Sequence, residues 1–291
     1  MYINVLGIIV FIFFDYALIL GKMGFPQLGL SGSAMASIIQ YAIMNLIAIA
    51  YIMFNPDYAR YFEKAFFMMF NPAGAWRLIN LSWPIMIDKT SLSFAYLWLA
   101  KMIAPMGTLV IASMDVIKNL ERVAMLPSLA FASIITFLVS NRLGALDLDG
   151  ARANVKKVLV MATIMVTVFV IVICWKAHYF ISFFDPKGKF VDFAAPLLSV
   201  ISTLVIFDLI QVTLAGALRG AGDVKTVMYG RFFVIALFYI PLAYGFSILP
   251  IENVSVKFCL IYSSFYLSNA VMGFIFLKRI IGNNWQKKQI G

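Results

Sequence analysis

Eight ionisable side chains interrupt the long apolar segments of this sequence. A charged group in the middle of a bilayer costs about 2.5 kcal/mol or more, so such groups usually face a bundle interior or a water-filled cavity. Five acids against three bases predict a net negative interior, which suits protons, metal cations or organic cations. The eight are Asp15, Asp88, Lys89, Asp115, Lys118, Glu121, Arg122 and Asp208.

Asp208 is the strongest candidate for cation chemistry. Only apolar residues occupy 205–207 and 209–210, and the nearest polar neighbour is Gln211, about one helical turn later. A lone buried carboxylate can exchange protons, or bind Na⁺ together with neighbouring oxygens. The alternative is a neutral, hydrogen-bonded structural aspartate. Asp15 has the same character, and for it the two interpretations are equally open.

Four of the charged residues share one apolar segment. At 100° per residue, Asp115, Lys118 and Arg122 lie within about 60° of arc, while Glu121 lies about 120° from Asp115. This spacing predicts a charged helix face. The face is either a self-neutralised set of i, i+3 and i, i+4 pairs or part of a substrate cavity.

Asp88 and Lys89 are neighbours in sequence and point about 100° apart on a helix, so they cannot pair closely. Each is therefore expected to need a partner on another helix. Structural pairing and a role in a cavity both stay open at this point.

The composition sets the class of protein that must position these groups. Of the 291 residues, 63% are hydrophobic and only 12% are charged, which excludes a water-soluble globule. A spanning helix needs about 20 mostly apolar residues. The sequence therefore predicts an all-α, polytopic membrane bundle of about eight spans. They run approximately over 3–20, 32–54, 78–100, 108–140, 155–178, 193–218, 227–248 and 258–280.

Several other chemistries are excluded by the residues themselves. There is no Gly-rich phosphate loop ending in Lys-Ser/Thr, so the chain does not hydrolyse ATP to drive transport. His178 is the single histidine, and Cys174 and Cys259 lie in apolar runs, so metal clusters and a His-based catalytic triad are excluded. We expect neither an enzyme nor a cofactor. The net charge of +10 is explained by anionic lipid head groups without nucleic acid.

The distribution of Lys and Arg predicts the orientation. Fourteen of them flank one set of span ends, including Arg219, Arg231 and Arg279, and six flank the other set. The richer side is predicted to be cytoplasmic, which places both ends of the chain there. The polar stretch 55–77 is predicted to be a cytoplasmic linker, with two spans before it and six spans after it.

The stretch from Gly216 to Thr226 (GALRGAGDVKT) resembles the signature after the tenth helix of the multidrug and toxic compound extrusion (MATE) family. Three further matches keep the family's order. Residues 15–29 resemble its fifth helix and the loop that follows, Glu121 with Pro127 resembles its eighth helix, and residues 143–152 resemble the next loop.

The resemblance implies a fold of twelve helices in two lobes, of which this chain has helices five to twelve. Residues 1–54 would be the last two helices of the amino-terminal lobe, and 78–291 the six-helix carboxyl-terminal lobe with a short cytoplasmic tail. The first four helices are absent, so they are a possible partner within the same native chain.

The activity that the resemblance implies is antiport by alternating access in a bacterial inner membrane. A gradient of H⁺ or Na⁺ would drive export of small amphipathic, typically cationic drugs or toxic metabolites, with membrane lipids as the other partners. Two alternatives stay open. One is a lipid-intermediate flippase of the wider superfamily, for which Lys89, Lys118 and Arg122 would be essential. The other is a truncated remnant that does not transport.

The resemblance also implies roles for particular residues. Asp208 with Gln211 matches the cation-coupling acid of the family's tenth helix, and Asp15 matches a fifth-helix position. Leu92 stands where many relatives have a glutamate, and Asp88, one turn earlier on the same face, would replace that glutamate. The implied substrate cavity is lined by Lys89, Asp115, Lys118, Glu121 and Arg122.

Overall fold

The computed structural model describes residues 2–55, 72–185, 187–282 and 285, and in these residues helices are the only regular secondary structure. The all-α prediction is confirmed. The chain forms two compact units, Met1–Trp76 and Arg77–Gly291. Most of the predicted linker 55–77 lies outside the described residues. Its last part is helical, because α4 (Pro72–Ile103) begins within it.

The first unit contains two long helices, α1 (Tyr2–Leu20) and α2 (Leu30–Phe54), which pack against each other. The connecting loop starts at Gly21, whose φ of +65° favours glycine. Gly32 of α2 lies so close to α1 that a Cβ there would be 2.7 Å from the Leu18 carbonyl oxygen. A small residue at this point allows the two backbones to approach closely.

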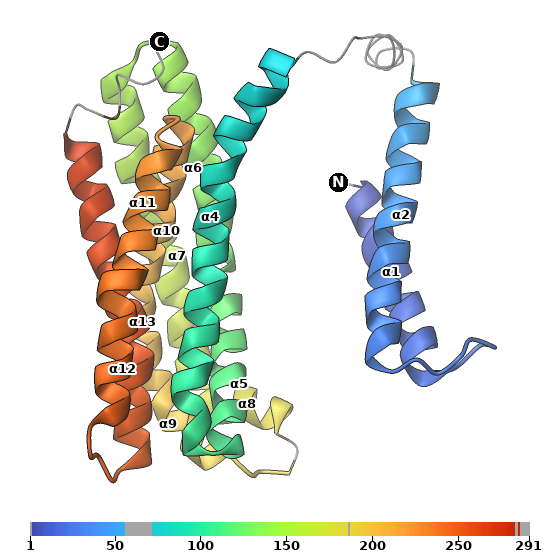
Figure 1. Cartoon of the computed structure of the whole chain (residues 1–291), viewed down its shortest axis with the longest axis vertical. Helices are drawn as coiled ribbons and strands as arrows, with labels where there is room; N and C mark the ends of the chain where they lie inside the picture. Colours follow the sequence, from blue (N-terminus) through green and yellow to red (C-terminus); the bar gives the residue numbers. More distant parts are fainter. Residues whose placement is uncertain (1, 56–71, 186, 283–284, 286–291) are drawn as a thin grey trace. The chain divides into compact units, whose positions relative to one another are not determined.

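In the second unit, α4 and the helices that follow it run side by side as a bundle (Figure 1). The central helix is α10 (Val205–Gly220), which packs against α6, α7 and α13. After α4 and the short η1 (Ala104–Met106), the elements in chain order are α5 (Thr108–Ala124), α6 (Leu126–Gly144), α7 (Leu148–Trp175), α8 (Ala177–Phe184), α9 (Val191–Ser202), α10, α11 (Val224–Val234), the π-helical η2 (Ile235–Tyr239), α12 (Ile240–Ile248) and α13 (Val254–Ile281).

Two of the predicted spans, 108–140 and 193–218, are interrupted, whereas the predicted span 227–248 lies within one continuous helical segment, Val224–Ile248. The segment predicted as one span over 108–140 is two helices that break at Met125, with Pro127 in the first turn of α6. A proline has no N–H to donate and its ring clashes with the carbonyl four residues earlier. The same property accounts for the π-helical turn before Pro241. Helices α9 and α10 meet at a bend of 48°.

Six described helical segments are long and apolar enough to cross a membrane, or seven if α9 and α10 form one bent span. The predicted number was eight. The predicted span that is missing from this set is α4. It is long enough to cross a membrane, but the charged residues Asp88, Lys89 and Lys101 make it less apolar than the other long helices. The prediction of a multi-pass helical membrane fold is confirmed. The short helix α8 was not predicted.

Two glycines of the GALRGAGDVKT stretch bring α10 against α6. A Cβ on Gly216 would lie 2.6 Å from the Ala132 carbonyl oxygen, and one on Gly220 would collide with the Thr136 carbonyl oxygen. The Thr136 hydroxyl donates a hydrogen bond of 2.8 Å to the carbonyl of Gly216. The stretch therefore fixes the position of α10, the helix that carries Asp208 and Gln211.

Candidate functional site

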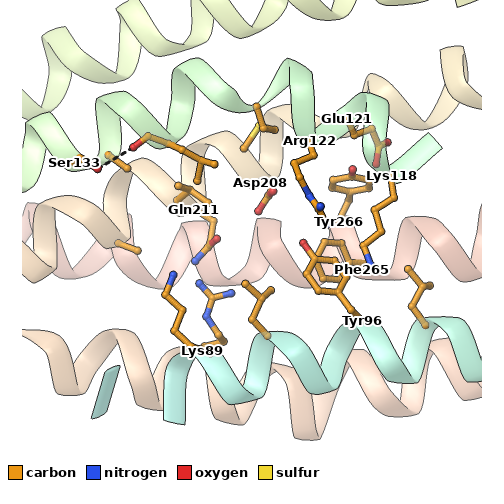
Figure 2. Close-up of a pocket in the computed structure, with 18 of the residues that line it drawn as sticks. Lys89, Tyr96, Lys118, Glu121, Arg122, Ser133, Asp208, Gln211, Phe265 and Tyr266 are labelled. Atoms are coloured by element: carbon orange, nitrogen blue, oxygen red, sulfur yellow. Dashed lines mark hydrogen bonds between the residues drawn. The ribbon is translucent and has the colours of Figure 1, made fainter. Parts of the chain in front are cut away.

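A cavity of about 460 Å³ lies inside the second unit, between α4, α5, α6, α10, α11 and α13. Figure 2 shows Lys89 and Gln211 at one end, Lys118 with the aromatic rings at the other, and Asp208 between them. Six of the nine candidate residues line this cavity: Lys89, Lys118, Glu121, Arg122, Asp208 and Gln211.

The other three candidates lie elsewhere. Asp88 is buried outside the cavity lining, and Asp115 is exposed on α5. Asp15 belongs to α1 in the first unit. The candidates on α4, α5 and α10 therefore converge in part on one cavity within the second unit.

The polar groups around Asp208 have unused hydrogen-bonding capacity. The Asn269 amide on α13 donates to Asp208 Oδ1 at 3.1 Å. Gln211 is fully buried, and neither its Nε2 nor its Oε1 has a hydrogen-bond partner among the residues the structure describes; the same holds for Asn269 Oδ1. Buried polar atoms are nearly always paired, so these groups are suited to an ion, a ligand or ordered water.

Glu121 forms the acidic part of the aromatic end. Its Oε2 accepts a hydrogen bond of 2.7 Å from the Tyr262 hydroxyl, and its buried Oε1 has no partner within the described ranges. Lys118 Nζ lies 3.7 Å from the ring centroid of Tyr96. The described residues show no direct ion pair between two members of the predicted charged face, and both interpretations of it, as self-neutralised pairs or as part of a substrate cavity, stay open.

Asp88 is the centre of a buried ionic cluster. Arg219 Nη2 on α10 donates to Asp88 Oδ2 at 2.7 Å, and Arg231 Nε on α11 donates to Oδ1. The predicted need for a partner on another helix is confirmed for Asp88. The two arginines were missed as site residues, because their positions near predicted span ends assigned them to the cytoplasmic loops. The sequence did contain one indication of this cluster, because Asp88 lies in an apolar segment and has no basic partner within its own helix that it can reach.

A second ion pair stabilises the turn between α10 and α11. Asp223 is fully buried and accepts hydrogen bonds from Arg279 Nε at 2.7 Å and from the Thr226 hydroxyl at 2.8 Å. Arg279 had also been counted as a loop cation. Three of the fourteen cations used for the orientation are therefore bound to acids inside the bundle.

The charge of the cavity differs from the prediction. Of the described residues that line it, five are basic and two are acidic. The predicted net negative interior is wrong for this cavity, because Arg219 and Arg231 join the lining while Asp15, Asp88 and Asp115 do not. The basic residues are Lys89, Lys118, Arg122, Arg219 and Arg231, and the acids are Glu121 and Asp208.

Long apolar helices around an internal charged cavity define a multi-pass membrane protein with a polar site inside its bundle. Residues 84–245 match the model of the MatE family, and the chain belongs to that family. The resemblance noted in the sequence is confirmed.

Relatives in sequence are bacterial proteins named for drug resistance. The chain is 25% identical over 245 residues to the multidrug resistance protein NorM of Photobacterium profundum, covering 84% of this chain and 54% of that protein. It is 29% identical over 259 residues to the probable multidrug resistance protein NorM of Pasteurella multocida, with 84% and 53% covered. The chain thus spans about half the length of the curated relatives it matches.

Solved structures with the same fold include a MATE protein in a bent conformation, with a TM-score of 0.77 at 15% identity, covering 100% of this chain and 63% of that one. Another is a transporter of the MOP superfamily from Pyrococcus furiosus that is described as having a binding pocket of reversed polarity. It has a TM-score of 0.76 at 15% identity and covers 99% of this chain and 62% of that one. These likenesses establish the fold.

Proposed function

We propose that this chain contributes a lobe of a secondary transporter that exports small amphipathic organic compounds by cation-coupled antiport. The observation that carries the proposal is Asp208, an acid on the central helix α10 that lines a cavity, with the unpartnered amide of Gln211 and the unpartnered amide oxygen of Asn269 nearby. Membership of the MatE family and relatives named for multidrug resistance support it. Solved structures of this fold titled as inward-facing and outward-facing also support it.

The coupling step is a competition at Asp208. Binding of a cation removes one negative charge from the cavity and so changes its affinity for a charged substrate. The bound cation and the bound substrate then stabilise different conformations of the transporter, inward-facing or outward-facing. Such a difference in affinity between two conformations is the thermodynamic requirement for exchange. Glu121 is a second acid in the same cavity and modulates this equilibrium, while Asp88 is held by two arginines and serves to position them.

The donor set at Asp208 is compatible with either H⁺ or Na⁺. A proton needs only the carboxylate. Na⁺ needs several oxygens, and the carboxylate of Asp208 together with the free amide oxygens of Gln211 and Asn269 would supply them. Within the described residues there is no group of three or more His, Cys, Asp or Glu that could hold a metal ion.

The proposal places the chain in a bacterial inner membrane with both of its termini in the cytoplasm. The length of the relatives supports a further helix group in the intact transporter, supplied by the same native chain or by a separate one. The size of the endogenous protein, measured by immunoblot with a tag after Gly291, distinguishes a mass near 32.6 kDa from a larger one.

A flux assay tests the transport proposal. The native protein that contains this chain, with any further helix group, is reconstituted into proteoliposomes, and efflux of ethidium and of naphthylacetate is followed under an imposed H⁺ gradient or an imposed Na⁺ gradient. Flux of either compound that depends on one of the gradients supports the proposal and identifies the coupling ion. A folded native protein that gives no gradient-dependent flux of either compound contradicts the proposal and favours the non-transporting remnant.

One observation favours the lipid-intermediate flippase as a second candidate. Lys89, Lys118 and Arg122, the basic residues that such a protein would need, all line the cavity. Translocation of a fluorescent lipid with a phosphate head group, in the absence of any efflux of the two soluble compounds, would select this alternative.

A further inference from the structure

We propose that one end of the cavity, the basic end formed by Lys89, Arg219 and Arg231, binds the anionic group of an amphipathic compound. The anionic group is a carboxylate, sulfonate or phosphate. The inference rests on the proposed function in one respect, because it takes this cavity to be the one that holds the transported compound. It names the substrate class as anionic, whereas the sequence alone had favoured organic cations.

The charges at the basic end do not cancel. Asp88 supplies one negative charge against the two guanidinium groups, and the Lys89 ammonium adds a further positive charge. Each arginine uses one of its five N–H donors on Asp88 in these contacts, so further donors of Arg219 and Arg231 stay available. Guanidinium groups bind carboxylates and phosphates particularly well, because their planar donors match two oxygens at once.

The basic end is organised before any ligand arrives. Asp88 is 2% exposed and holds both guanidinium groups from outside the cavity lining, while the side chain of Arg219 is 24% exposed. The unpartnered amide of Gln211 points into the same part of the cavity as the Lys89 ammonium (Figure 2). A ligand oxygen there would meet an additional amide donor at little reorganisation cost.

The other end of the cavity offers aromatic rings against which the apolar body of a ligand can pack, beside Lys118 and Glu121. Tyr96, Phe265 and Tyr266 line it, with the rings of Tyr96 and Phe265 5.1 Å apart. Lys118 already lies over the Tyr96 ring, so an organic cation would have to displace this ammonium to use that ring face. The cavity volume of about 460 Å³ falls within the usual range for small-molecule sites.

A matched pair of ligands tests the sign of the preferred charge. Naphthylacetate and naphthylmethylammonium share an aromatic body and carry opposite charges. Binding of each is measured by equilibrium dialysis against the full chain in phosphatidylcholine nanodiscs, with protein-free nanodiscs as the blank. We expect the carboxylate to bind at least about tenfold more tightly than the ammonium compound, since it meets several charge-assisted donors. Equal binding, tighter binding of the ammonium compound, or no binding of either by the folded chain overturns the inference.

Two variants of α4 locate the preference within the molecule. Lys89→Gln removes a charge from the basic end, and we expect about tenfold weaker binding of naphthylacetate with little change for the ammonium compound. Lys101→Gln makes the same change on the same helix outside this cavity and should leave both affinities unchanged. Equal losses in the two variants would overturn the assignment to the basic end.

The source of the anion is distinguished in the same assay. Displacement of naphthylacetate by phosphatidylglycerol added to the nanodiscs supports an anionic lipid as the natural ligand, and retention of binding supports a soluble anionic amphiphile. Failure of the transport proposal is distinguishable from failure of this inference. A chain that binds the carboxylate selectively but gives no gradient-driven flux contradicts only the former.

Discussion

The Asp88 carboxylate on α4 accepts a hydrogen bond from the Arg231 guanidinium on α11, and both side chains are almost wholly buried in the bundle. Arg219 on α10 binds the other carboxylate oxygen. The cluster therefore ties three helices together beside the cavity. Asp88 lies outside the cavity lining, whereas both arginines line the cavity. The carboxylate therefore neutralises part of their positive charge without occupying the space that a ligand would use.

Replacing Asp88 should destabilise the protein strongly. In Asp88→Asn the buried Arg231 guanidinium and the partly buried Arg219 guanidinium lose their counter-charge, and we expect a loss of about 3–5 kcal/mol in the free energy of unfolding, measured by SDS titration in mixed micelles. Asp115→Asn changes an exposed acid of α5 and should stay within about 0.5 kcal/mol of the wild type. Similar stabilities for the two variants would contradict a structural role for the ionic cluster.

The close contact between α10 and α6 gives a second prediction. Gly220→Ala places a methyl group against the Thr136 carbonyl oxygen, so the helices must separate, and we expect a loss of about 1–3 kcal/mol in the same titration. Gly245→Ala on α12 is the matched control, because nothing lies within 4 Å of its added Cβ. That variant should be neutral or gain up to about 1 kcal/mol from helix propensity. If Gly220→Ala is as stable as Gly245→Ala, the helices do not pack as closely as described.

The hydrogen bond from Tyr262 to Glu121 gives a third prediction. Tyr262→Phe removes the hydroxyl group that donates a hydrogen bond to Glu121 Oε2. The buried carboxyl group of Glu121 then lacks this hydrogen bond. We expect the free energy of unfolding to fall by about 1–3 kcal/mol. Tyr244→Phe, at an exposed position of α12, should have little effect. Restoration of stability in the double variant Tyr262→Phe with Glu121→Gln would confirm that the loss comes from this pair, and an unchanged loss would contradict it.

The sequence was sufficient to predict the membrane fold and part of the site. The apolar runs located the long helices, and the isolation of Asp208 between apolar residues identified an acid that does face the cavity. Helix breaks were harder to predict. Pro127 lies next to the break at Met125, but its apolar surroundings made the segment 108–140 resemble a single span, whereas Pro241 lies inside a segment that does stay continuous.

The partners of the buried acids were not accessible from one sequence. Arg219 and Arg231 lie 131 and 143 residues from Asp88, and their pairing depends on how α10 and α11 pack against α4. The angular position of a residue on a helix also gives its face but not its depth. Asp115 shares a face with Lys118, yet it is one turn nearer the start of α5 and lies outside the cavity lining, whereas Glu121 lines it.

Coupling of cation binding to transport by Asp208 is tested by comparing gradient-driven efflux for two variants in proteoliposomes. Asp208→Asn removes one of the two acids that line the cavity, and Asp115→Asn makes the same chemical change at an exposed site. We predict that Asp208→Asn loses gradient-driven flux by about tenfold or more and no longer responds to pH, while Asp115→Asn transports like the wild type. Wild-type, pH-dependent flux by Asp208→Asn would contradict the account.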